Sequence, residues 1–515
     1  MTTSEVSQKT PYLVPPRRDE EDRVAPIPPG ALGLVLELRA ELTAKAVRYC
    51  HWKSNDMLAR SMDGHNDLDL LVHRRDAKRF LAVIAHLGFH RALAPAGRDH
   101  PGVAHYYSLD RGSGVLVHLH AHFQLVLGDD ATKNFRLPVE AAYLASVSRE
   151  EPLPIPAPEF ELSLFVVRMM LKHATWDALL LGNGRLGESE RRELAWLLSR
   201  VELDRCRAVI ETQLPVVGVD LWSRCLLSLT EDWPPRRRLV LGRRLLAAIA
   251  AHGRRPPAVD TAVRILRRGQ WAWARFVLRR PTRKRLERTG ITIGIVGGDG
   301  SGKSTAVEAV ATWLGSTFVV HRTHLGRPRP SLLTLALKGP MYVARRLGRL
   351  PSTTRSVDPA TASIEDFPGA AWALWHVLTA RDRQREYRAL RRVADRGGIV
   401  ISDRWPLPYL HLMDCSRAAW VLDRSPRASP VVRWLARTER RLYADIAAPD
   451  VLVVLRIDPE LAVARRPEDD PAYVRSRNGE VFDTDWRHID AVVVDASRPP
   501  EQVLAAIRNA VWDRL

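Results

Sequence analysis

The pattern of hydrophobic and polar positions changes twice along the chain, and each change predicts a different kind of structure. Between residues 31 and 146, apolar and polar residues alternate in DLDLLVH, HYYSLD and GVLVHLHAHFQL beside a helical pattern, which predicts a small α/β domain. From about residue 158 to 254, apolar residues recur at three- and four-residue spacing, as in ELSLFVVRMMLKHA and ERRELAWLLSRV, which predicts a helical domain. From residue 290, short apolar runs alternate with helical patterns, which is typical of α/β proteins with a parallel sheet.

These patterns divide the chain into five segments. We expect a disordered tail over 1–30, an α/β domain over 31–150, a helical domain over 151–255, a basic linker helix over 256–289 and a second α/β domain over 290–515. The tail is rich in proline and mixed charge and lacks the apolar core of a signal peptide. Because no run of about 18 apolar residues occurs, we expect no membrane-spanning helix.

Composition narrows the class of protein. With 46% hydrophobic residues among 515, the chain has ample material for two or three packed cores. The four cysteines lie far apart without a C-x-x-C pair, which favours reduced thiols in a cytoplasmic protein: Cys50, Cys206, Cys225 and Cys415. The net charge of +19 predicts attraction of anions such as nucleotides or acidic lipid. Without a zinc finger, an RNA-binding signature or a repeat in the sequence, we do not expect a nucleic-acid partner.

The linker segment RILRRGQWAWARFVLRRPTRKRLER, residues 264–288, combines dense arginine with Trp271, Trp273 and Phe276. Two interpretations are open. The segment is a solvated connecting helix with one packed stripe, or it makes peripheral contact with an anionic membrane surface.

The stretch GIVGGDGSGKST, residues 294–305, fits the G-x-x-x-x-G-K-[ST] phosphate loop. An apolar run over 291–296 precedes it and a helical pattern ending near Gly315 follows it, so the loop lies between a strand and a helix. We expect Lys303 to be an exposed loop residue that reaches the β- and γ-phosphates, and Ser304 to help hold Mg²⁺. The expected nucleotide-binding residues are Gly297, Asp299, Gly300, Ser301, Gly302, Lys303, Ser304 and Thr305.

A second chemical signal is GGIVISDRW, residues 397–405. A buried strand over 399–401 ends at Asp403 and Arg404, and parallel sheets bind ligands at the carboxyl ends of their strands. We therefore place Asp403 on Mg²⁺ or its waters and Arg404 on a phosphoryl oxygen. A further strand over 451–455 leads into the arginine-dense segment RIDPELAVARRPEDDPAYVRSRN, which could close over transferring phosphates.

The order of GGDGSGKST, ARDRQREYRALRRVADRGGIVISDRW, VLRIDPELAVARR and VVVDASRPPEQV resembles the thymidylate kinase family over residues 290–515. The resemblance implies an ATP- and Mg²⁺-dependent kinase in which Asp299 and Arg383 touch the acceptor, while Asp403 and Arg404 serve metal and phosphate. It also implies lid arginines that neutralise the transferring group, and the candidates are Arg465, Arg466, Arg475 and Arg477.

Two departures from this family concern the acceptor, and a third is an additional segment. The Arg-Glu-Pro-Gly run of the family is replaced by HRTHLGRPRPS, in which Arg327 is the candidate substrate contact, and the thymine-reading residues are replaced by WPLPYLHLMD. An additional segment, SLLTLALKGPMYVARRLGRLPSTTRSVDP, lies between loop and Asp-Arg pair. We therefore predict that thymidylate is a poor acceptor and that another small phosphorylated or hydroxyl-bearing molecule is better.

In the N-terminal half, HWKSNDMLARSMDGHNDLDLLV resembles the nucleotidyltransferase fold. Asp67 and Asp69 point to the same face of a strand, as a shared Mg²⁺ requires. The strand that should supply a third carboxylate reads VLVHLHAHFQL, and its period of two places His118, His120 and His122 on one face, opposite Val117, Leu119, Ala121 and Phe123. These histidines could bind a softer metal, bind an anion or reflect lost catalysis.

The leading functional hypothesis is a phosphotransferase that moves the γ-phosphate of ATP to a small acceptor. Two alternatives are open: a nucleotide-operated regulatory or scaffolding protein, and a nucleotidyltransferase centred on the N-terminal domain.

Overall fold

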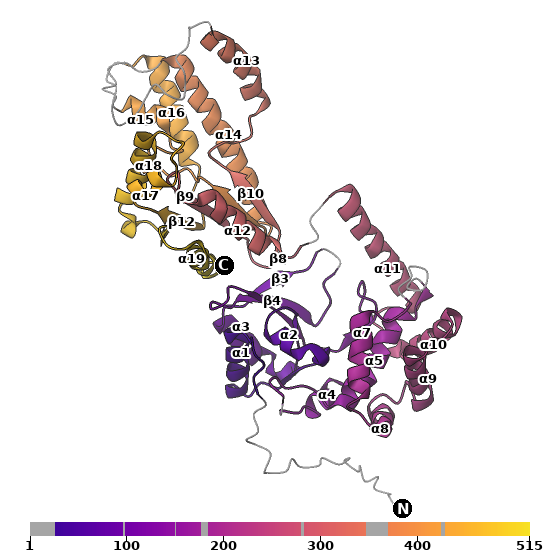
Figure 1. Cartoon of the computed structure of the whole chain (residues 1–515). Coiled ribbons are helices and arrows are strands. Elements are labelled where there is room, and N and C mark those ends of the chain that lie inside the picture. Colours follow the sequence, from indigo (N-terminus) through magenta and orange to yellow (C-terminus); the bar gives the residue numbers. More distant parts are fainter. Residues whose placement is uncertain are drawn as a thin grey trace, which may run out of the picture.

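The computed structural model describes residues 26–95, 98–149, 151–176, 184–279, 283–346, 369–423 and 428–515, with the side chains of 341–346 excepted. Most of the predicted tail and the last part of the additional segment therefore lie outside the described residues. Within these residues the chain is a mixed α/β protein with one large sheet in each half, a small two-stranded sheet in the first half, and a group of helices beside the first large sheet (Figure 1). All four cysteines are buried and free.

The N-terminal sheet has the strand order β1-β2-β5-β4-β3-β8. Its strands are β1 (Tyr49–His51), β2 (Leu68–Val72), β3 (His90–Leu93), β4 (Val103–Leu109), β5 (Leu116–His122) and β8 (Arg285–Leu286). Strands β2 and β5 are parallel, and the other pairs are antiparallel.

One face of this sheet is apolar and the other is polar. Val117, Leu119 and Ala121 of β5 pack into a core with helices α1 (Gly33–Ala44) and α3 (Ala77–His86). The intervening histidines lie on the opposite face, so the predicted alternation along this strand is confirmed.

Shorter elements connect these strands: η1 (Asn55–Met57), α2 (Leu58–Met62), η2 (Arg74–Asp76), β6 (Val126–Leu127), β7 (Phe135–Arg136) and α4 (Glu140–Ala145).

The helical region is built around α5 (Pro158–His173), which is apolar on most sides because other helices surround it. Those helices are α7 (Glu188–Leu198), α8 (Leu203–Gln213), α9 (Val219–Thr230) and α10 (Pro235–Ala248), followed by η3 (Ala250–His252). Gly242 of α10 permits a close approach, since a Cβ atom there would lie 2.2 Å from the carbonyl oxygen of Ala174.

We predicted one linker helix over residues 256–289, and this prediction is wrong because the structure divides the segment. Helix α11 (Pro257–Ala272) continues into the π-turn η4 (Trp273–Val277), and the chain then forms β8. Strand β8 pairs with β3, because the edge of the first sheet offers backbone hydrogen-bond partners that a continued helix would leave unused.

The C-terminal sheet is parallel throughout, with the order β10-β11-β9-β12-β13. Its strands are β9 (Thr292–Gly297), β10 (Val320–His324), β11 (Ile399–Asp403), β12 (Val451–Arg456) and β13 (Val492–Asp495). After β9 the chain continues to β10 at one edge of the sheet. After β11 it continues to β12, which lies on the opposite side of β9. Connections therefore diverge between β9 and β11, which is where open parallel sheets bind ligands.

Helices cover both faces of this sheet. Ile293 and Ile295 pack with α12 (Lys303–Gly315) and α19 (Pro500–Trp512), whereas Val296 packs with α14 (Ala370–Ala394) on the other face. The remaining helices are α13 (Leu332–Arg346), α15 (Arg417–Leu422), α16 (Pro430–Ala444), α17 (Pro459–Ala464), α18 (Pro471–Asp483) and η5 (Trp486–His488). Across the described ranges, no helix is both long and apolar enough to cross a bilayer.

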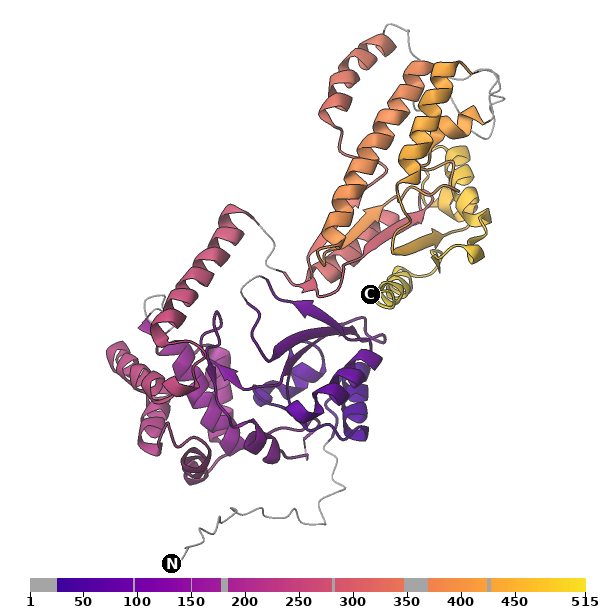
Figure 2. The same cartoon turned by 180° about the vertical axis from the view of Figure 1, so that it is seen from behind.

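The two halves meet at the amino-terminal end of the second sheet (Figure 2). The Trp512 indole donates to the Gly88 carbonyl at 3.1 Å, and the Lys284 ammonium donates to the Tyr107 hydroxyl at 2.7 Å. The backbone N–H of Leu286 donates to the Gly397 carbonyl at 3.0 Å. The first sheet consequently lies near the carboxyl end of α12, whose thirteen residues span about 20 Å.

Candidate functional site

The phosphate loop connects β9 to α12 at the carboxyl edge of the second sheet. Gly300 and Gly302 have φ angles of 84° and 85°, which favour glycine. A Cβ atom on Gly298 would lie 2.0 Å from Oδ1 of Asn478, so the loop is packed tightly against α18. A glycine-rich turn at a helix N-terminus presents backbone N–H groups to anions.

Lys303 is 6% exposed, so the expectation of an exposed loop lysine is wrong. Its ammonium lies inside the loop, where it donates to the Gly298 carbonyl and lies 3.9 Å from Oδ1 of Asp299. Burial lowers the pKa of Lys303 to about 8, against the opposing effect of Asp299. The side chain is buried because it folds back from the first turn of α12 beneath its own loop.

Ser304 and Asp403 meet at the divergence point between β9 and β11. The Ser304 hydroxyl donates to Oδ2 of Asp403 at 3.3 Å. Oδ1 of Asp403 is buried and has no hydrogen-bond partner among the described residues. A hydroxyl and a carboxylate with an unused oxygen fit Mg²⁺, which prefers oxygen ligands.

Asp299 is held by two arginines of the predicted site. Arg404 and Arg477 donate to its two carboxylate oxygens at 3.0 and 2.9 Å. Burial alone would raise the pKa of Asp299, but the charges of Arg477, Lys303 and Arg404 lower it. Arg404 has a φ angle of 60°, a strained conformation of the kind that clusters at functional sites.

The four lid candidates differ in position. Arg477 is buried against Asp299, and the Cγ atom of Arg466 would lie 3.3 Å from a Cβ atom on Gly300. Arg465 is exposed and donates to the Ala496 carbonyl at 3.0 Å, while Arg475 pairs with Glu460 at the surface. The structure thus brings the guanidinium of Arg477 to the loop. The aliphatic part of Arg466 lies beside Gly300, but its guanidinium pairs with Glu468 at 3.0 Å. Arg465 and Arg475 are bonded elsewhere.

Arg383 is buried, and its guanidinium donates to the carbonyls of Leu325 and Gly326 at 2.6 and 3.1 Å. It also pairs with Asp414 at 3.2 Å and contacts the Tyr443 hydroxyl. These contacts fix the loop that follows β10. The other predicted substrate residue, Arg327, is exposed at the end of that loop.

Asp414 and His324 lie beside this loop, and neither was among the predicted site residues. A Cβ atom on Gly326 would lie 2.7 Å from Oδ2 of Asp414, 2.7 Å from Cε1 of His324 and 3.1 Å from Cδ of Arg404. Oδ2 of Asp414 and Nδ1 of His324 are buried and lack partners within the described ranges. Asp414 ends the WPLPYLHLMD segment, which the sequence marked only as a departure.

The apolar part of that segment fills the core. Trp405, Leu407 and Leu410 are each at most 3% exposed and pack with residues of α14. They therefore offer no polar side chain for reading a base.

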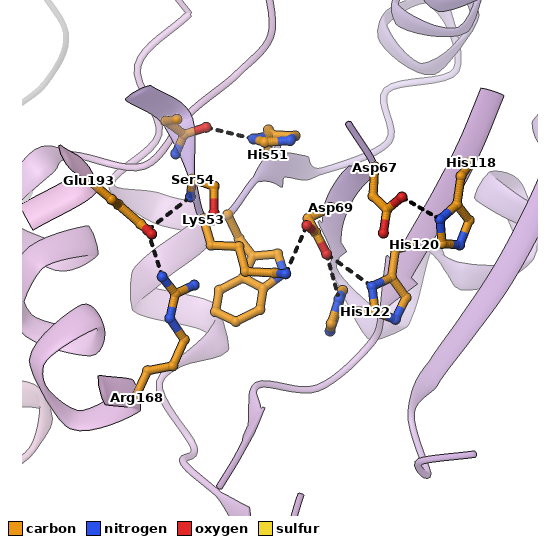
Figure 3. A network of polar contacts seen from close by, with 12 residues as sticks. His51, Lys53, Ser54, Asp67, Asp69, His118, His120, His122, Arg168 and Glu193 are labelled. Carbon is orange, nitrogen blue, oxygen red and sulfur yellow. Dashed lines mark hydrogen bonds and ion pairs between the residues drawn. The ribbon is translucent and has the colours of Figure 1, made fainter. Parts of the chain in front are cut away.

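The polar face of the first sheet forms a second cluster (Figure 3). Oδ1 of Asp67 lies 2.6 Å from Nδ1 of His118, and Oδ1 of Asp69 lies 3.0 Å from Nδ1 of His120 and 3.3 Å from Nε2 of His122. The structure therefore brings both predicted aspartates to the predicted histidine face.

Burial and neighbouring charges determine the pKa values of the groups in this cluster. Burial would raise the pKa of Asp69, but the Lys53 charge and hydrogen bonds from His120 and His122 hold it well below its usual range. Burial lowers the pKa of His122 to about 3 and that of His105 to about 2. At neutral pH the Asp69 carboxylate is thus ionised, and the imidazoles of His105 and His122 are neutral.

Lys53, which sequence reasoning missed, lies 2.8 Å from Oδ2 of Asp69. The helical region fixes the turn that carries it, because the backbone N–H of Ser54, with φ of 58°, donates to Glu193 at 3.1 Å. Glu193 in turn pairs with Arg168 of α5 at 2.6 Å. Next in the turn, Asn55 donates to buried Glu161 at 2.8 Å. No local pattern in the sequence marks these partners.

The histidine face opens into a cavity of about 1290 Å³ that is also bordered by α11 and by residues 316–317 after α12. Its basic lining residues are Lys53, Arg98, Lys133, Lys172, Arg185, Arg267, Arg268, Arg283 and Lys284, against the acidic Asp67, Asp129, Asp130 and Glu190. The surplus of positive charge favours an anionic ligand. The phosphate loop lies at the opposite end of α12.

No protein-family model matches the chain. The chain is 27% identical over 227 residues to the uncharacterized ATP-binding protein YghR of Escherichia coli strain K12, which covers 42% of this chain and 86% of YghR. It is 25% identical over 221 residues to the uncharacterized ATP-binding protein YghS of the same strain, which covers 42% of this chain and 91% of YghS. The chain is thus similar to two ATP-binding proteins over less than half of its own length.

Proposed function

We propose that the chain is an ATP- and Mg²⁺-dependent phosphotransferase with a thymidylate kinase-like C-terminal domain. The observation that carries this proposal is the meeting of Ser304 and Asp403 beside the phosphate loop, with one carboxylate oxygen of Asp403 left unpartnered. Similarity to proteins named ATP-binding supports the nucleotide.

The chain contributes mainly position and charge to this reaction. The loop N–H groups and Lys303 hold the phosphates. Burial removes water from the Lys303 ammonium and lowers its pKa, and the negative charge of a bound phosphate offsets that loss. Ser304 and Asp403 would hold Mg²⁺, which would neutralise charge on the phosphoryl oxygens. Arg404 and Arg477, fixed by Asp299, add two positive charges where negative charge develops.

The acceptor is a hydroxyl-bearing small molecule on this proposal. A kinase that phosphorylates a hydroxyl uses a carboxylate to accept the hydroxyl proton, and the free Oδ2 of Asp414 is a candidate near Arg404. A phosphate acceptor needs no such base. Thymidylate is expected to be poor, because Trp405 and Leu407 belong to the core.

The substitution Asp414→Asn tests this assignment. We expect it to lower kcat with hydroxyl acceptors by about 100-fold or more while leaving the Kd for ATP unchanged. Asp423→Asn is the matched control, since Asp423 is exposed and pairs with Arg440. Efficient turnover of thymidylate by the wild-type chain, at the level of a dedicated thymidylate kinase, would refute the acceptor class.

The end of the linker supports an additional proposal of peripheral contact with anionic membrane. Trp273 and Phe276 of η4 are 59% and 70% exposed, and arginines are dense around them. Cosedimentation with vesicles rich in phosphatidylserine tests this contact. We expect binding that Phe276→Glu weakens; binding unchanged by that substitution would reject the contact.

A further inference from the structure

The polar face of the first sheet holds a group of ligand atoms that the phosphotransferase reaction does not use. We propose that Asp69, His120 and His122 bind a divalent transition metal ion such as Zn²⁺ or Co²⁺, at a site separate from the Mg²⁺ ligands Ser304 and Asp403. This site replaces the Asp67–Asp69 magnesium pair that the nucleotidyltransferase resemblance implies.

The spacing of the ligand atoms carries the inference. One carboxylate oxygen and two imidazole nitrogens lie within 4.8 Å of one another. Nδ1 of His120 and Nε2 of His122 lie 3.0 and 3.3 Å from the same oxygen, Oδ1 of Asp69. A tetrahedral ion with bonds of about 2.1 Å separates its ligand atoms by about 3.4 Å, so a small movement of these side chains accommodates an ion.

The backbone holds these ligands in place without an ion. Asp69 lies on β2 and both histidines lie on β5, and Asp69 is directly paired with His120 in the parallel register. His122 and Asp69 are buried, and His105 stacks on His120 with ring centroids 4.4 Å apart. Sites built on packed strands lose little freedom when they bind an ion.

The chemistry of the ligand set selects the type of metal. Two imidazoles and one carboxylate suit Zn²⁺, Co²⁺ or Fe²⁺, whereas Mg²⁺ prefers oxygen ligands alone. Lys53 engages Oδ2 of Asp69 and leaves Oδ1 to the histidines. Of the three ligand residues, His120 borders the basic cavity, so an ion bound to it would lie beside the space that an anionic ligand would occupy.

Cobalt titration of the full chain, after chelation and desalting, tests the site. We expect one Co²⁺ per chain with the strong visible absorption of four-coordinate cobalt, displaced by Zn²⁺ and retained in excess Mg²⁺. His120→Ala and Asp69→Asn should each weaken cobalt binding more than 100-fold, because even the indirect supports of a metal site contribute 10- to 100-fold. His65→Ala is the matched control, since His65 is exposed and bonds Asp63.

Circular dichroism and thermal melting establish that each variant is folded before titration. Loss of the cobalt spectrum in folded His120→Ala and Asp69→Asn supports the site, provided that His65→Ala keeps it. A folded wild-type chain without the spectrum would overturn the proposal and leave a hydrogen-bonded cluster alone. The proposal would also be overturned if both ligand variants keep the cobalt spectrum, or if Mg²⁺ displaces the cobalt.

Discussion

The two polar sites of this chain differ in the groups that surround their central carboxylate. In the C-terminal half, one partly buried carboxylate, Asp299, is surrounded by Lys303, Arg404 and Arg477, which places three cations around the phosphate loop. In the N-terminal half, Asp69 is surrounded by one lysine and two imidazoles. The first arrangement suits transferring phosphate, whereas the second suits a metal ion beside a cavity lined mainly by basic residues.

The largest expected effect comes from removing the loop cation. Lys303→Ala should lower γ-phosphate transfer by about 1000-fold or more, because the ammonium neutralises charge in the transition state. The fold should persist, since burial already disfavours the charged lysine. Transfer rates and melting temperatures measure both effects. Lys338→Ala, at an exposed position of α13, is the control. Near-wild-type transfer by Lys303→Ala would remove the loop from the reaction.

A smaller loss is expected at Asp403, the carboxylate that we propose as an Mg²⁺ ligand. Asp403→Asn should lower turnover by about 100-fold and raise the Mg²⁺ concentration needed for half-maximal rate, while ATP affinity changes less. The control is Asp495→Asn, at the carboxyl end of the edge strand β13, where Asp495 bonds Ser497. An unchanged magnesium titration for Asp403→Asn would contradict its role.

The lowered pKa of Lys303 predicts a pH effect at the C-terminal site. Since this pKa is about 8 in the free chain, Lys303 loses its proton above pH 8, and ATP binding then requires proton uptake. The Kd for ATP should rise by up to about tenfold per pH unit above 8, measured by calorimetry. Lys303→Arg, whose guanidinium stays charged, should flatten this profile. A flat wild-type profile between pH 7.5 and 9.5 would be inconsistent with the shift.

The smallest effect tests whether the two regions are independent. Asp67→Asn with Asp69→Asn should leave γ-phosphate transfer within about twofold of wild type, because the first sheet lies near one end of α12, a helix about 20 Å long, and the phosphate loop lies at the other end. The same double variant should abolish any nucleotidyl transfer. Loss of γ-phosphate transfer in a folded double variant would show that the halves form one site.

The regions also differ in how far their sequence predicts them. The phosphate loop, Ser304 and Asp403 were predictable because loop spacing and strand ends are local features. The histidine face of β5 followed from alternation along one strand.

Asp414 and Lys53 were not predictable, since Asp414 follows a proline-interrupted apolar segment and Lys53 is fixed by Glu193 through the turn at Ser54. Lys303 was placed wrongly, because a motif does not reveal that its side chain folds beneath the loop.

The central claim is that the C-terminal loop transfers the γ-phosphate of ATP, and single-turnover reactions with labelled ATP test it most directly. Chain in excess over ATP is incubated with Mg²⁺ and a panel of nucleosides, nucleoside monophosphates, sugars and sugar phosphates, using γ-labelled or α-labelled nucleotide in parallel. We predict label transfer to a small acceptor from γ-labelled ATP only, abolished by Lys303→Ala. Transfer of the α-label, or tight ATP binding without any transfer across the panel, would contradict the claim.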